Sequence, residues 1–246
     1  MAEAALIHPD WPAPAGVRAV SSTRLGGFSQ APWGGLNLGG HVGDEPSAVA
    51  ANRRQLFQMI GLPESACWLQ QVHGARVVPA SRQGCEADAS ITGQPGEVCA
   101  VMTADCLPLL LCDLQGTRVA AVHAGWRGLA AGVIENTLDG FACPARDILA
   151  WMGPAIGPSA FEVGAEVRQV FIEQDEQASQ AFKPGLGDRW LADIYLLARL
   201  KLRRKGTWRI FGGDYCTYSD PGRFFSYRRD GQTGRMASLI WLNGDG

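Results

Sequence analysis

Two apolar segments, each meeting one reactive side chain, constrain this chain more than any other feature. Cys106 lies in the segment Thr103-Ala-Asp-Cys-Leu-Pro-Leu-Leu-Leu111, and His123 lies in Val119-Ala-Ala-Val-His-Ala-Gly-Trp-Arg-Gly128. Short continuous apolar runs are typical of buried strands, so the thiol and the imidazole are expected at strand ends. A second imidazole, His73, lies at a bend in Gln70-Gln-Val-His-Gly74. The chain therefore has one candidate Cys/His reaction centre.

The composition is that of a folded protein without a footprint for nucleic acid or membranes. Of 246 residues, 46% are hydrophobic and 19% are charged, and the net charge is -2. This balance provides no basic patch for nucleic acid and no polybasic segment for a membrane surface. The N-terminus lacks the regions of a signal peptide, and no stretch approaches the roughly 18 apolar residues of a spanning helix. We therefore expect a cytoplasmic protein that is a monomer or a weak homodimer.

The counts of cysteine and histidine limit the metal chemistry. The seven cysteines are odd in number and contain no CxxC pair, which argues against a disulfide framework. The four histidines are too few for a multinuclear copper cluster. A single metal ion is the most that this chain is expected to hold.

No linker, repeat or change of composition divides the chain, so we expect one α/β domain of the α+β type over residues 1–246. Strand-like segments occur both next to each other and with helices between them, which favours mixed sheets. Pro108 predicts an edge or a break, with the strand resuming at Leu109. The other elements that matter below are helices over Asp44–Leu62 and Leu129–Leu138, and strands over Val98–Met102, Ile148–Met152, Phe224–Arg228 and Met236–Leu242.

Polar side chains in Gly-rich loops are candidates for substrate contacts. Arg24 and Asn37 lie in the loops of residues 22–29 and 34–40, where glycine lets the backbone approach a ligand. Arg127 lies in a loop between a strand and a helix, an arrangement suited to anions. Arg228 opens a polar turn that reaches residue 235, whose arginines can face the site or solvent. For Arg24 and Asn37, the alternative is a loop that only connects strands, and for Arg127 it is a pair with a surface acid.

The Cys/His set suggests three kinds of chemistry. A thiolate with two imidazoles suits zinc, and three protein ligands leave the fourth tetrahedral position for water or substrate. Alternatively, Cys106 and His123 form a metal-free nucleophile and base, or the set is a blue-copper site with Met102 as the axial ligand. Asp105 lies on a kinked connection beside the thiol, either as an acid or as a turn carboxylate that binds local N–H groups.

Several motifs together resemble the laccase-domain family of purine nucleoside phosphorylases, formerly called polyphenol oxidases. The similarity extends from Trp11 to Leu242, nearly the whole chain. The motifs that carry it are Gln71-Val-His-Gly74, Thr103-Ala-Asp-Cys-Leu-Pro108, Val122-His-Ala-Gly-Trp-Arg-Gly128, Gly153-Pro-Ala-Ile-Gly157 and Phe225-Ser-Tyr-Arg-Arg-Asp-Gly231.

The resemblance implies a fold, a metal and an activity. The fold is a layered α/β/β/α-like arrangement of mixed sheets, related to bacterial cysteine-deamidase toxins. The metal is one zinc ion per chain, held by His73, Cys106 and His123, with copper less expected. The activity is phosphorolysis of adenosine, inosine and S-methyl-5'-thioadenosine to the base and ribose 1-phosphate, together with adenosine deamination.

On this basis we assign further roles and keep three alternative functions. Asp105 is the candidate acid for the departing base, while Arg24, Asn37, Arg127 and Arg228 are the candidate contacts to substrate or phosphate. The first alternative is a Cys/His amidase or a peptidoglycan-precursor editing hydrolase. The second is a copper-dependent polyphenol oxidase, and the third is a zinc-binding interaction protein without enzymatic activity.

Overall fold

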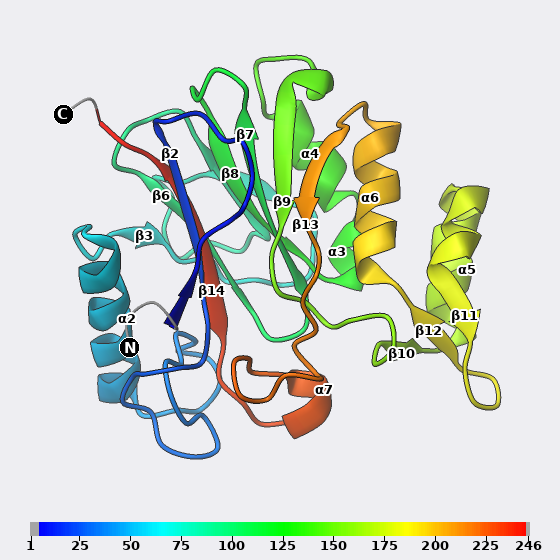
Figure 1. The fold of residues 1–246 in the computed structure, drawn as a ribbon, viewed down its shortest axis with the longest axis horizontal. Helices are drawn as coiled ribbons and strands as arrows, with labels where there is room; N and C mark the ends of the chain where they lie inside the picture. Colours follow the sequence, from blue (N-terminus) through cyan, green and yellow to red (C-terminus); the bar gives the residue numbers. More distant parts are fainter. Residues whose placement is uncertain (1–4, 245–246) are drawn as a thin grey trace.

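Two central sheets form the body of the protein, which was obtained as a computed structural model and is described for residues 5–244. The first sheet has five strands, in the order β1-β2-β14-β6-β3 (Figure 1). All pairings in it are antiparallel except that of β3 with β6. Its strands are β1 (Leu6–Ile7), β2 (Val17–Ser22), β14 (Met236–Leu242), β6 (Val98–Thr103) and β3 (Ala66–Cys67).

The second sheet has six strands and carries two of the reactive side chains. Its order is β13-β9-β7-β8-β5-β4, with parallel pairs at both edges and antiparallel pairs in the middle. Its strands are β13 (Arg209–Gly212), β9 (Ile148–Met152), β7 (Leu107–Asp113), β8 (Val119–Ala124), β5 (Ala89–Thr92) and β4 (Val77–Pro79). A small third sheet consists of β10 (Glu162–Val163), β12 (Trp190–Ala192) and β11 (Phe182–Pro184).

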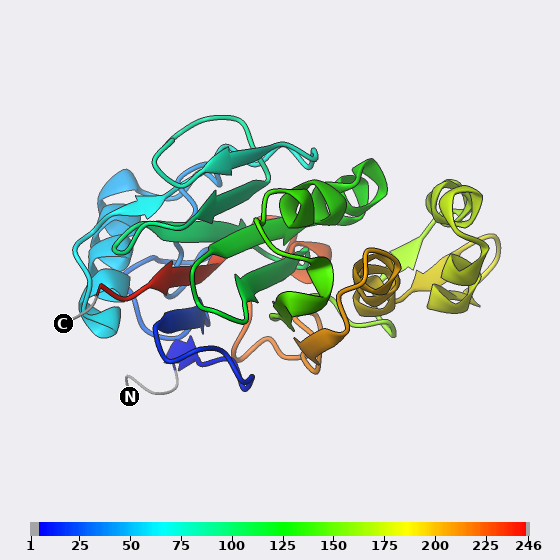
Figure 2. The ribbon, with the colours of Figure 1, turned by 90° about the horizontal axis from the view of Figure 1, so that it is seen from above.

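Helices cover the outer faces of both central sheets. Figure 2 shows α2 at one end of the molecule, the sheets in the middle, and α4, α6 and then α5 towards the other end. The helices are α2 (Pro46–Ile60), α3 (Trp126–Ala131), α4 (Val133–Asp139), α5 (Ala165–Gln174), α6 (Ile194–Arg204) and α7 (Tyr227–Asp230), with 3-10 turns at Ala145–Asp147 and Glu176–Ala181. The predicted α/β/β/α arrangement of mixed sheets is confirmed.

The side chains of β7 explain the layers, because neighbouring residues of a strand point to opposite faces of the sheet. Leu109 and Leu111 pack in the cluster that contains the helical residues Leu129 and Ile134. Leu110 packs against the first sheet, in a separate cluster. A third cluster joins the outer face of the first sheet to α2. Both faces of β7 are therefore buried, as its continuous apolar sequence predicts.

The predicted break at Pro108 is wrong, because β7 begins at Leu107 and runs through the proline in the middle of the sheet. The carbonyl of Pro108 accepts a hydrogen bond from the Gly153 N–H, on the side of β9. The ladder with β9 starts only at the next residue, Leu109, which pairs with Met152. Proline has no N–H to donate, but residue 108 lies just outside this ladder, so the ladder loses no hydrogen bond.

Two further predicted elements near the centre are corrected. The expected helix Leu129–Leu138 starts earlier and is divided into α3 and α4, because Gly132 adopts a left-handed conformation (φ 91°) that ends α3. The expected strand Phe224–Arg228 is wrong. There, the Ser226 hydroxyl accepts a hydrogen bond from the Arg229 N–H and starts the short helix α7.

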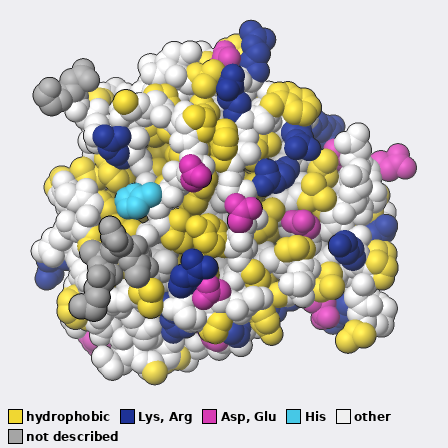
Figure 3. Space-filling view, viewed as in Figure 1, with side chains coloured by type: hydrophobic (Ala, Val, Ile, Leu, Met, Phe, Trp, Pro, Cys, Tyr) yellow, Lys and Arg dark blue, Asp and Glu magenta, His cyan; other side chains and the backbone are white. Residues whose placement is uncertain are grey.

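The surface shows no large region of a single charge on the face drawn in Figure 3, where basic and acidic side chains are interspersed. Among residues 5–244, no helix is long and apolar enough to cross a membrane.

Candidate metal centre

Three predicted ligands from three parts of the chain meet where β7 begins and β8 ends, in the middle of the second sheet. The sulfur of Cys106 lies 3.8 Å from Nε2 of His73. The rings of His73 and His123 are 4.8 Å apart, centre to centre, at an angle of 73°. One donor atom from each of the three residues lies within 4.8 Å of the others. This spacing suits a thiolate and two imidazoles around one metal ion.

Asp88 holds the loop that carries His73. Its buried carboxylate accepts hydrogen bonds from the backbone N–H groups of Val72, His73 and Gly74, at 3.2, 2.9 and 2.7 Å. His73 itself has a left-handed backbone (φ 59°), which a non-glycine residue rarely adopts. Because the carboxylate binds all three N–H groups, it can hold this unfavourable turn in place.

The same carboxylate orients His123. Nδ1 of His123 lies 2.8 Å from Oδ1 of Asp88, and both side chains are buried. A proton on Nδ1 leaves Nε2 as the nitrogen that is available to a metal or to the Cys106 thiol. A carboxylate behind a ligating histidine fixes the ring and increases its basicity. Asp88 was not among the site residues predicted from the sequence.

The centre favours a charged thiolate. Burial alone raises the pKa of Cys106, but the two imidazoles outweigh it and lower that pKa to about 6. Burial lowers the pKa of His123, yet Cys106 and Asp88 raise it to about 9. For Asp88, burial raises the pKa, but the hydrogen bonds from His123 and the backbone bring it below its ordinary value. Both states of the centre, thiolate with metal or thiolate with imidazolium, are compatible with these charges.

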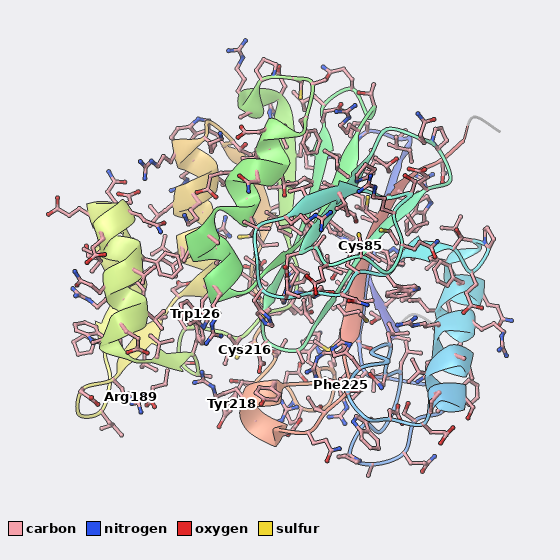
Figure 4. The ribbon with its side chains drawn as sticks, turned by 180° about the vertical axis from the view of Figure 1, so that it is seen from behind. Cys85, Trp126, Arg189, Cys216, Tyr218 and Phe225 are labelled. Carbon is pink, nitrogen blue, oxygen red and sulfur yellow. The ribbon has the colours of Figure 1, made fainter. Side chains whose placement is uncertain are left out.

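Gly125 leaves the space in which the ligands meet. A Cβ atom at this position would lie 2.9 Å from the Cys106 sulfur and 3.1 Å from Cδ2 of His73. Its backbone (φ −66°, ψ 161°) is open to any residue, so the absence of a side chain, rather than the conformation, is what the site requires. Immediately after it, Trp126 begins α3, as Figure 4 shows.

We expect Gly125→Ala to fold but to bind zinc about 10-fold or more weaker, because the added methyl group displaces two ligands. Zinc competition with a chelating dye measures the change. Gly16→Ala is the matched control, since a Cβ atom there meets nothing within 4 Å. Equal zinc affinity in both variants would show that Gly125 does not shape the site.

Asp105 links the thiol to α7. Its backbone is left-handed (φ 91°), so the predicted kink beside Cys106 is confirmed. Oδ1 accepts a hydrogen bond from the Thr217 hydroxyl at 2.6 Å, and Oδ2 accepts one from the Arg228 N–H at 2.7 Å. The carboxylate therefore positions the start of α7 next to the centre.

Arg24 and Asn37 are tied into the fold. The guanidinium of Arg24 donates to the carbonyls of Pro221 and Gly34 and lies 4.7 Å from the ring centre of Phe225. The Asn37 side chain is fully buried. Its amide donates to Asp44, and its oxygen accepts the N–H of Arg235 at 2.8 Å. The structure does not bring the Asn37 side chain to the centre.

Arg127 and Arg228 are exposed and point to neighbours other than the ligands. The guanidinium of Arg127 lies 4.5 Å from the ring centre of Trp126. That of Arg228 donates to the carbonyl of Glu162 at 2.7 Å and lies over Phe161. Arg127 lies on α3, two residues after Gly125, and Arg228 lies on α7, where its N–H binds Asp105.

A pocket beside α7 contains residues that the sequence analysis missed. Met236 pairs with Thr103, which places the preceding residue, Arg235, near the segment that carries Cys106. The sequence predicted only that the arginines of the turn 228–235 can face the site or solvent. We name this cavity of about 320 Å³ the α7 pocket; it is lined by His41, Val42, Tyr227, Gly231, Gln232, Thr233 and Arg235.

The fold and the centre define a layered α/β protein with a Cys/His/His set at the ends of two central strands. A family model described as multi-copper polyphenol oxidoreductase laccase matches residues 18–243. The chain therefore belongs to this family, and the resemblance of its motifs is confirmed.

Relatives with assigned names cover nearly the whole chain. Purine nucleoside phosphorylase YfiH of Escherichia coli K12 is 57% identical over 240 residues, which are 96% of this chain and 98% of the relative. A purine nucleoside phosphorylase of Pseudomonas aeruginosa is 55% identical, with coverage of 97% and 98%.

Solved structures show the same fold. A Neisseria meningitidis protein of family DUF152 is 50% identical, with a TM-score of 0.94 over 98% of this chain and 100% of that protein. YlmD of Geobacillus stearothermophilus is 30% identical, with a TM-score of 0.89 and coverage of 98% and 97%.

Proposed function

We propose that this chain is a zinc-dependent purine nucleoside phosphorylase that also deaminates adenosine. The substrates are adenosine, inosine or S-methyl-5'-thioadenosine together with phosphate. The observation that carries the proposal is the convergence of His73, Cys106 and His123 beside the α7 pocket. The names of the relatives from Escherichia coli and Pseudomonas aeruginosa support the nucleoside chemistry.

Zinc fits the donor set better than copper does. One thiolate and two imidazoles are a zinc combination with an open position, and Gly125 keeps that space free. The alternative blue-copper site needs a weak axial ligand. Met102 does not serve, because it packs in the cluster that covers α2 and its sulfur lies 4.0 Å from the Arg53 guanidinium. The chain has only four histidines, which excludes a multicopper cluster. When bound, zinc would supply a Lewis acid for an oxygen of water or substrate.

Three residues of the chain have further roles in the proposed reaction. Asp88 fixes the imidazole of His123 and the turn of His73, so the ligands need not reorganise during the reaction. Asp105 stays our candidate for the acid that protonates the departing base. Each of its oxygens accepts one hydrogen bond in this structure, and the remaining lone pair of either oxygen can carry the proton that is donated. The exposed ring of Tyr227, in the α7 pocket, offers a face for the purine.

The experiment is product analysis with the zinc-loaded protein and adenosine, with and without phosphate. Phosphorolysis gives adenine and ribose 1-phosphate only when phosphate is present, whereas deamination gives inosine, which phosphate then converts to hypoxanthine and ribose 1-phosphate. If none of these products appears while zinc is bound, the proposed function is refuted.

A cysteine amidase, including a peptidoglycan-precursor editing hydrolase, is the second candidate. The specific observation in its favour is the order Cys106, His123, Asp88, in which a carboxylate orients the imidazole next to a thiol with a lowered pKa. This candidate predicts amide hydrolysis that survives removal of zinc. It also predicts that a thiol reagent modifies Cys106 and abolishes the activity.

A further inference from the structure

The α7 pocket contains one guanidinium, that of Arg235. Arg235 donates hydrogen bonds to the carbonyls of Thr233 and Gly234. In the part of the chain that the structure describes, it forms no ion pair with a carboxylate. Burial lowers the pKa of Arg235, while the nearby charges of Cys106 and Asp105 raise it in part. The guanidinium therefore keeps donors for a ligand and lies close to the metal ligands.

His41 also lines the pocket, and nearby cations act on its imidazole. Burial lowers the pKa of His41, and the cations of Arg235, Arg53 and His123 lower it further. No carboxylate offsets these cations among the groups that act on His41. The residues that line the pocket include the guanidinium of Arg235 and the imidazole of His41 but no aspartate or glutamate, and this balance favours an anion.

Thr233 adds an observation that is independent of charge. This residue is 2% exposed and lines the α7 pocket. Its Oγ1 has no hydrogen-bond partner within residues 5–244. A buried hydroxyl without a partner costs free energy that a ligand can recover. Thr233 and Arg235 are two residues apart in the sequence, and both line the pocket.

We propose that Arg235, Thr233 and His41 bind a tetrahedral oxyanion, inorganic phosphate, next to the metal centre. The assignment of this phosphate as the second substrate rests on the proposed function, whereas the binding site itself does not. A guanidinium and a hydroxyl donate to separate phosphate oxygens, and the N–H of the neutral imidazole adds a third donor. The set replaces Arg24 and Asn37, whose side chains are committed to loop contacts.

The position also suits attack on a nucleoside. Arg235 lies 5.9 Å from the ring centre of Tyr227, so an anion and a flat base can occupy neighbouring parts of one cavity. Asp105 holds the N–H of Arg228 and thereby joins α7 to the segment of Cys106. The phosphate would therefore bind between the metal ligands and the nucleoside, in reach of the ribose.

Calorimetric titration of the zinc-loaded full chain with inorganic phosphate tests the site. We expect saturable binding to wild type, and binding about 10-fold or more weaker to Thr233→Val and to Arg235→Lys, because a donor or the bidentate geometry is lost. Thr233→Val should be at least as stable as wild type to thermal unfolding, because it removes an unpaired buried hydroxyl. The side chain of Arg235 packs against Gly39, so Arg235→Lys can fail to fold. In that case Thr233→Val still tests the site.

Arg189→Lys is the matched control, since Arg189 is exposed and belongs to the loop that leads into the small sheet, away from α7 (Figure 4). Wild-type phosphate affinity in both Thr233→Val and Arg235→Lys would overturn the site. So would nucleoside phosphorolysis whose KM for phosphate is the same in these variants as in wild type. If phosphate binds with the expected pattern but no nucleoside is cleaved, the site stands and the proposed function fails.

Discussion

Cys106→Ala is expected to lose its zinc and at least about 1,000-fold of the nucleoside turnover. The thiolate is one of only three ligand groups in the centre. It is also the one that carries a negative charge, because its pKa is lowered to about 6. Two imidazoles alone leave a divalent ion with half of its tetrahedral shell unfilled. Metal analysis after gel filtration and product analysis on the same sample measure the two effects.

Cys85→Ala provides the control for Cys106→Ala. Cys85 is also a partly buried free thiol, but its sulfur lies 3.5 Å from the Arg82 carbonyl, outside the ligand set. It should keep zinc and turnover at the wild-type values. A Cys106→Ala protein that keeps full activity would contradict both the zinc reaction and the thiol-based alternative.

Asp88→Asn is expected to weaken zinc binding by about 10- to 100-fold and to lower the free energy of unfolding by about 3 kcal/mol. Oδ1 of Asp88 accepts from His73 and His123, and Oδ2 accepts from Val72 and Gly74. An asparagine replaces one of these oxygens by an NH₂ group, so two buried donors then face another donor. Urea unfolding and zinc competition measure the two consequences separately.

Asp113→Asn separates the loss of a buried carboxylate from the loss of the centre. Asp113 is also buried, and it accepts hydrogen bonds from the N–H and hydroxyl of Thr117. It lies at the end of β7 opposite to Cys106. We expect it to lose stability but to keep the zinc affinity of wild type. If Asp88→Asn behaves in the same way, Asp88 is only a structural residue.

The strands and the ligands were predictable for the same physical reason. Apolar runs such as Val98–Met102 and Met236–Leu242 leave little choice except burial in a sheet, and both strands are confirmed within one residue. Cys106 and His123 lie at the ends of such runs, where neighbouring strands bring them together. Residue type and position along the strand were therefore enough to bring Cys106 and His123 together, whereas His73, which lies at a bend, was added by residue type and by the family resemblance.

The errors arose where a tertiary contact decides local structure. Phe224–Arg228 has the aromatic content of a strand, but the Asp105 carboxylate binds the Arg228 N–H and stabilises a helical turn instead. A proline such as Pro108 usually interrupts a strand, but β9 ends at Met152, opposite Leu109, so the N–H that Pro108 lacks is not needed for the pairing. Neither contact is visible in the sequence around the residue concerned.

The surroundings of the triad were only partly predictable. A carboxylate directly before a buried strand, as at Asp88, is a sign of a buried polar partner and would have pointed to its role behind His123. Arg235 gave no such sign, because its place depends on the pairing of β14 with β6. Arginine in a polar turn is usually solvated, and only the distant strand pairing brings this one to the α7 pocket.

The central claim is most directly tested by product analysis of adenosine with phosphate and protein that holds about one zinc ion per chain. We predict ribose 1-phosphate in an amount equal to the adenine and hypoxanthine together, formed only with phosphate and absent with Cys106→Ala. Adenosine recovered unchanged, with neither these products nor inosine, would contradict the account.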